Sequence, residues 1–169
     1  MQTEVIALSE LQRTKVWEGW LSSEILAHYF GDLAGRYRSR QRRLTWLILI
    51  FSSGAAATLL SDWLPQSWGV IKPILALLTA AISLLLVVEE NGQRRVDCSD
   101  LYFQWSRLAS DYEALWDDMY SEDAPARLRT LDDRAAVLSQ RGTTMPTRKR
   151  LLVKWQDYVE ERHRVQTTA

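Results

Sequence analysis

Two uncharged apolar runs, residues 44–61 and 73–88, constrain the fold of this 169-residue chain more than any other feature. Neither run contains Asp, Glu, Lys, Arg or His, although charged residues make up 25% of the chain. A helix of that length in water normally keeps one polar face, and these runs have none. As helices they would measure about 27 Å and about 24 Å, close to the roughly 30 Å hydrocarbon core of a bilayer. We therefore predict an all-α membrane protein built on a two-helix transmembrane hairpin.

The rest of the chain is expected to form helices on one side of this hairpin. Residues 1–43 are predicted to be an N-terminal cytosolic helix or helices with a basic end, with a break allowed near Gly19 or around Gly31 and Gly35. Residues 44–90 form the hairpin, with helices over about 44–62 and 69–90. Residues 91–120 form a long amphipathic cytosolic helix, and residues 121–169 form a C-terminal helical cap. The N- and C-terminal helices together would make a cytosolic bundle.

Basic residues flank the hairpin and indicate its orientation. The arginines before the first run are Arg36, Arg38, Arg40, Arg42 and Arg43. Arg94 and Arg95 follow the second run, whereas the connecting turn carries only Lys72. By the positive-inside rule both termini are cytoplasmic. The alternative is a helical hairpin buried in a soluble bundle, but a chain this short could hardly surround two helices on all sides.

The arginine cluster before the first run has two interpretations. It can anchor the chain to anionic headgroups, or it can bind the phosphates of a nucleotide ligand. A second basic group, Arg148, Lys149 and Arg150, starts the last predicted helix, where positive charge opposes the helix dipole. That group is either a phosphate-contacting site or a solvated surface.

The clearest periodic signal lies after the hairpin. Apolar residues step by three and four in a seven-residue repeat, which is typical of a helix–helix seam. The seam residues are Cys98, Leu101, Trp105, Leu108, Tyr112, Leu115 and Met119. The seam can close an intramolecular bundle with the N-terminal helix, or join copies of the chain around a shared axis, and both can hold together.

Catalytic motifs are not found in the sequence. There is no P-loop, no G-x-G-x-x-G, no G-x-S-x-G and no H-E-x-x-H. His28 and His163 have no ligand partners at metal-binding spacing, and the single cysteine, Cys98, falls on the apolar stripe. Adjacent pairs such as Asp132–Asp133 point about 100° apart on a helix and are expected on solvated faces. We therefore expect no enzyme, no cofactor and no metal site.

Conduction by such hairpins would need several copies around an axis, and four is our working number. The second run offers a candidate pore lining at helical spacing: Ala76, Thr79, Ser83 and Glu90. Alternatively, the small residues of both runs simply let the helices approach closely.

The order of these parts resembles the SLATT family, the two-membrane-helix effectors associated with bacterial nucleotide-synthesising defence systems. The resemblance covers roughly residues 20–120 and lies in residues 28–46 (HYFGDLAGRYRSRQRRLTW), the hairpin, and residues 103–116 (FQWSRLASDYEALW). It implies a homo-oligomeric pore in the bacterial inner membrane during phage infection, and a partner nucleotidyltransferase whose product controls the pore. It implies no catalytic residues.

Two functions are therefore expected from the sequence. The first is a homo-oligomeric ion channel and antiphage effector, gated from the cytosol by a nucleotide signal. The second is a membrane-anchored helical scaffold or adaptor that recruits a cytosolic partner without conduction.

Overall fold

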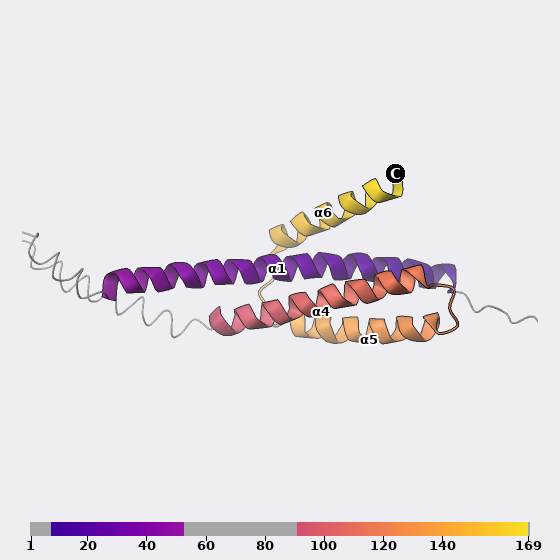
Figure 1. Cartoon of the computed structure of the whole chain (residues 1–169), viewed down its shortest axis with the longest axis horizontal. Helices are drawn as coiled ribbons and strands as arrows, with labels where there is room; N and C mark the ends of the chain where they lie inside the picture. Colours follow the sequence, from indigo (N-terminus) through magenta and orange to yellow (C-terminus); the bar gives the residue numbers. More distant parts are fainter. Residues whose placement is uncertain (1–7, 53–90, 169) are drawn as a thin grey trace, which may run out of the picture. The chain divides into compact units, whose positions relative to one another are not determined.

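The computed structural model describes residues 8–52 and 91–168, which belong to two units. The first unit comprises residues 1–33 and 97–169, and the second comprises residues 34–96. The described helices are α1 (Glu10–Ser52), α4 (Asn91–Asp117), α5 (Ala124–Gly142) and α6 (Lys149–Thr168), shown in Figure 1. Since these residues contain helices, turns and loops but no strand, the expectation of an all-helical chain holds for them.

The predicted transmembrane hairpin needs correction. Over residues 8–52 and 91–168, no helix is both long enough and apolar enough to span a bilayer. Residues 44–52 do not start a separate helix but continue α1, directly after its arginine-rich turns. On this finding the membrane fold class, the ion-channel and pore-forming terms and the inner-membrane location are wrong.

The remainder of the predicted hairpin, residues 53–90, lies outside the described residues. This range includes the predicted pore-lining positions Ala76, Thr79, Ser83 and Glu90. The break allowed near the glycines of the N-terminal segment is not found, because α1 continues through Gly19, Gly31 and Gly35.

The seven-residue stripe of α4 forms the core of the first unit. Its buried members, each at most 2% exposed, are Cys98, Leu101, Trp105, Leu108, Tyr112 and Leu115. α1 contributes Val16, Ala27 and Leu33 to the buried set. α5 adds Leu128, Leu131 and Leu138, and α6 adds Leu151 and Val159. The described residues thus place the stripe inside the helical bundle of one chain.

Helices α1 and α4 approach closely because two glycines of α1 face aromatic rings of α4. A β-carbon at Gly19 would lie 2.6 Å from Cζ of Tyr112, and one at Gly31 would lie 3.1 Å from Cδ2 of Tyr102. At the end of this pair, the Leu8 N–H donates to the carbonyl of Met119 over 3.5 Å. The rings thus fill the space that larger α1 side chains would occupy.

Helices α4 and α5 run antiparallel and lie side by side (Figure 1). α5 begins at Ala124, next to Pro125, and ends at Gly142. Arginines of α5 at seven-residue intervals pair with two aspartates of α4 and with Asp118, the residue directly after it. The pairs are Arg127–Asp118 at 2.7 Å, Arg134–Asp111 at 2.6 Å and Arg141–Asp100 at 2.6 Å.

Helix α6 contacts α1 through aromatic and charged side chains. The imidazole of His28 stacks on Trp155 with 4.7 Å between ring centroids, and Lys154 lies 3.6 Å from the Asp32 carboxylate. The phenol of Tyr29 accepts the Arg148 N–H at 3.1 Å and donates to the Pro146 carbonyl at 3.2 Å. Tyr29 thereby fastens the α5–α6 connection to α1.

Candidate functional site

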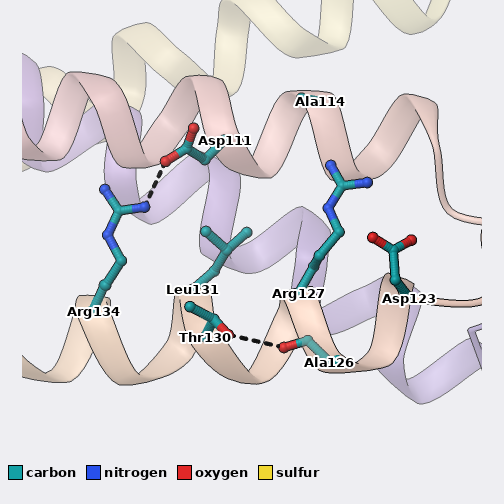
Figure 2. Close-up of a pocket in the computed structure, with 8 residues that line it drawn as sticks. All are labelled: Asp111, Ala114, Asp123, Ala126, Arg127, Thr130, Leu131 and Arg134. Carbon is teal, nitrogen blue, oxygen red and sulfur yellow. Dashed lines mark hydrogen bonds and ion pairs between the residues drawn. The ribbon is translucent and has the colours of Figure 1, made fainter.

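A groove of about 410 Å³ runs between α4 and α5 and is the first candidate site. Figure 2 shows Arg127 and Arg134 rising from α5 toward α4, with Leu131 between them. The groove is lined by Asp111, Ala114, Asp123, Ala126, Arg127, Thr130, Leu131 and Arg134. No sequence pattern marks these residues for binding, because the periodic signal of α4 marks its buried stripe and most of the groove residues belong to α5.

The arginines of the groove are paired with aspartates. Arg134 donates to Asp111 at 2.6 Å, and Arg127 donates to Asp118 at 2.7 Å. The lining itself holds two carboxylates, Asp111 and Asp123, and two guanidinium groups, Arg127 and Arg134, so its formal charges balance. Thr130 turns its hydroxyl back to the Ala126 carbonyl at 3.1 Å, so the middle of the groove presents small and apolar groups.

Two large apolar side chains continue this face beyond the groove lining. Phe103 is 68% exposed and Val137 is 57% exposed. Phe103 precedes Ala114 by three helical turns, so both lie on one face of α4, and Val137 follows Ala126 by three turns on α5. We call the groove lining together with Phe103 and Val137 the α4–α5 face. An exposed apolar surface beside balanced charges is typical of a protein contact rather than of a catalytic site.

A second polar cluster surrounds Glu24 in the contact between α1 and α6. One carboxylate oxygen accepts from Arg162 at 2.6 Å, and the other lies 2.8 Å from Nε2 of His163. His28, one turn after Glu24, lies 3.8 Å from the carboxylate. The cluster borders a pocket of about 270 Å³ that also includes Glu113 of α4.

The Glu24 cluster is a feature that sequence reasoning missed. His163 is 6% exposed and packs edge-on against Trp17 and Trp20, with centroid distances of 5.3 and 5.0 Å. In the sequence, His28 and His163 have no metal-binding partners at short spacing. The fold nevertheless brings both histidines to the carboxylate of Glu24. Within residues 8–52 and 91–168 no group of three or more His, Cys, Asp or Glu side chains could hold a metal ion.

The predicted phosphate-contacting residues lie in two places. Arg36, Arg38, Arg40, Arg42 and Arg43 are all exposed on the α1 segment of the second unit. The second set, Arg148, Lys149 and Arg150, is exposed at the start of α6 in the first unit.

Cys98, Asp100 and Tyr112, all in the first unit, have shifted pKa values. Burial, with a smaller effect of Asp97, raises the pKa of the Cys98 thiol to about 11. Hydrogen bonds from Gln104 and then from Arg141 lower the pKa of Asp100. Burial and the hydrogen bond to Asp132 raise the pKa of Tyr112. Cys98 is fully buried, as the sequence predicts, and its thiol stays protonated at neutral pH.

Comparison of the chain with models of protein families, with curated proteins and with solved structures finds no match in any of the three. The resemblance to the SLATT family therefore stays a prediction.

Proposed function

We propose that this chain is a helical scaffold that assembles with further copies of itself and recruits a protein partner, and that the α4–α5 face joins the copies. The observation that carries the proposal is the exposure of Phe103 and Val137 beside a charge-balanced groove. The proposal assigns the chain no reaction of its own.

The buried stripe of α4 supports an assembly through the outer face. Leu101, Leu108 and Leu115 are at most 1% exposed because they fill the core of one chain. Those residues are therefore unable to join a second chain without unfolding the bundle. Association must use residues that the bundle leaves exposed, and large apolar side chains gain most from leaving water.

The charges of the α4–α5 face favour a second copy as its occupant. A strongly acidic or basic partner would meet as many like charges as opposite ones in the lining of the groove. An antiparallel copy can instead place each aspartate near an arginine of the other chain, and a two-fold contact uses the same patch on both sides. The formal net charge of zero also leaves little long-range repulsion between copies.

Sedimentation of the full chain over a concentration series tests this function. Phe103→Glu and Val137→Glu each place a carboxylate in the contact and are expected to lower the mass toward that of the monomer. Val153→Glu is the matched control, since Val153 is 52% exposed on α6, away from the α4–α5 face. A monomer at every concentration, or equal weakening by all three variants, would overturn the proposal, and circular dichroism checks that each variant remains helical.

A second candidate function is supported by a different observation, the exposure of arginines on α1. Arg38, Arg42 and Arg43 are solvent-facing on one helix and could contact the phosphates of a nucleotide signal made by a partner nucleotidyltransferase. Calorimetric titration with cyclic dinucleotides and trinucleotides tests this candidate. Arg38→Glu with Arg42→Glu should abolish binding, whereas Arg129→Glu, an exposed arginine of α5, should leave it unchanged. Equal loss in both would indicate attraction by net charge alone.

A further inference from the structure

The pocket of about 270 Å³ beside the Glu24 cluster is lined by three helices of the first unit, α1, α4 and α6. The α4 wall consists of Tyr102, Ser106, Ala109, Ser110 and Glu113. These residues lie on one side of α4 within about three helical turns, a length of about 17 Å. The pocket is therefore elongated along α4, and we call it the α1–α4–α6 cleft.

The polar groups of the cleft differ in whether they have partners. Both oxygens of Glu24 are used, one by an arginine and the other by a histidine of α6. The polar side chains of the α4 wall, in contrast, make no hydrogen bond or ion pair with any group in the described part of the chain. They are Ser106, Ser110 and Glu113. This wall therefore offers two hydroxyl groups and one carboxylate to a molecule in the cleft.

The charges of the lining favour a cation. The Glu24 carboxylate is balanced by Arg162 at 2.6 Å, which leaves the Glu113 carboxylate as the unbalanced charge of the lining. Ser110 lies three residues before Glu113, so its hydroxyl and that carboxylate are neighbours on the helix surface. A primary ammonium group carries three donors and no acceptor, and it therefore matches this pair of acceptors.

Aromatic rings line both ends of the cleft. Helices α1 and α4 run antiparallel, because Gly19 lies against Tyr112 and Gly31 lies against Tyr102. Trp20, next to Gly19, therefore lies at the carboxylate end of the cleft, and Tyr102 lies at the other end. An indole ring beside a carboxylate favours an ammonium group, and the tyrosine ring provides apolar contact for the rest of a ligand.

We propose that the α1–α4–α6 cleft binds a small primary amine with an apolar body, and that its ammonium group donates to Glu113 and Ser110. The apolar body extends along α4 past Ala109 toward Tyr102. A cavity of about 150 Å³ is enough to bind benzene, so the cleft has room for a phenyl ring with a short amino-alkyl chain. This assignment is independent of the α4–α5 face and goes beyond the scaffold function.

A matched pair of probes tests the proposal on the full chain. Phenylethylamine and phenylethanol have nearly the same shape, but only the amine is positively charged at neutral pH. The amine should bind about fivefold more tightly, as an ion pair in contact with water predicts, and this preference should shrink at high salt. In amide spectra the amine should shift the signals of Ser110 and Glu113, whereas those of Ala126 and Thr130, in the α4–α5 groove, should not move.

Glu113→Gln removes the charge but keeps the size of the side chain, so the two probes should then bind nearly equally. Glu122→Gln is the control, because it removes the same charge from an exposed residue of the turn after α4 that does not line the cleft. This control should keep the preference for the amine.

Equal binding of both probes to the unaltered chain, or no binding of either, would overturn the proposal. A preference that persists in Glu113→Gln, or that is lost equally in Glu122→Gln, would also overturn it, since the amine would then be attracted elsewhere or by net charge alone. Tighter binding of Nα-acetyl-lysine amide than of phenylethylamine would assign the cleft to a lysine side chain of a protein and overturn the assignment to a free amine.

Discussion

Gly19 of α1 lies directly against the ring of Tyr112 of α4: a β-carbon at Gly19 would be 2.6 Å from Cζ and 2.7 Å from Cε1. The same phenol donates its hydroxyl hydrogen to Asp132 of α5 at 2.8 Å. Tyr112 thereby connects three helices from a position that is 1% exposed. The packing of the first unit depends on this glycine being small.

Gly19→Ala is expected to destabilise the bundle. Alanine favours the helix by about 1 kcal/mol over glycine, but its methyl group would overlap a buried ring, and overpacking costs about 1–3 kcal/mol. Gly35→Ala is the matched control, since a β-carbon there meets no described atom within 4 Å, and it should stabilise the chain. Urea unfolding followed by circular dichroism measures both, and equal stabilisation by the two variants would contradict the close approach.

The raised pKa of Tyr112 predicts a loss of stability at high pH. The ordinary pKa of tyrosine is 10.0, and burial, then Asp132, raise the pKa of Tyr112 in the folded chain above that value. Between the two values the unfolded chain releases its proton first, so the free energy of unfolding falls as pH rises above about 10.

Tyr112→Phe removes the hydrogen bond to Asp132, so its free energy of unfolding at neutral pH should be about 1 kcal/mol lower. The fall of that free energy at high pH should be absent from this variant. The advantage of the unaltered chain over Tyr112→Phe should therefore shrink from about pH 8 to about pH 11. Unfolding curves at both pH values give this difference. Tyr120→Phe, at a 60% exposed tyrosine, is the comparison variant and should show no such change.

Part of this fold can be predicted from the sequence because it depends on local spacing. The repeat through Leu101, Leu108 and Leu115 places these residues on one helical face. In aqueous solution, an apolar helical face packs against other helices. The ends of α5 follow from Pro125 and Gly142, whose backbone preferences act within a turn. These features need no knowledge of which helix packs on which.

The other parts of the fold could not be predicted in this way. They depend on contacts between residues distant in the sequence, or on whether an apolar run is assumed to lie in lipid. His163 meets Glu24 only because α6 folds back on α1, and no periodicity links the two positions. The prediction of a hairpin rests on the missing charge and the length of the two runs, and neither reveals that residues 44–52 continue the arginine-bearing α1. The α4–α5 face is not evident in the sequence because Phe103 lies on α4 and Val137 on α5, and no local spacing shows that the two share one face.

The ion pairs between α4 and α5 are expected to contribute little to stability. The Arg134 and Asp111 side chains are 41% and 39% exposed, and pairs in contact with water contribute about 0–1 kcal/mol. Arg134→Ala should therefore cost less than about 1 kcal/mol, and less still at high salt. Leu131→Ala, between the ion pairs and 7% exposed, should cost about 2–5 kcal/mol. Urea unfolding at low and high salt separates the two, and a larger loss from Arg134→Ala would contradict this ranking.

The Glu24 carboxylate should hold α6 on α1 more than it holds the rest of the unit together. Its side chain is 13% exposed, and both of its oxygens are used, one by Arg162 and the other by His163. Glu24→Ala removes the carboxylate that these two α6 side chains share, which should cost about 1–3 kcal/mol of the free energy that docks α6. Amide hydrogen exchange should accelerate along α6 while the amides of α4 and α5 keep their protection. Glu161→Ala provides the control, because Glu161 is 66% exposed and pairs with Arg164 on the same helix. An acceleration spread evenly over all the described helices would show instead that α6 unfolds only with the whole bundle.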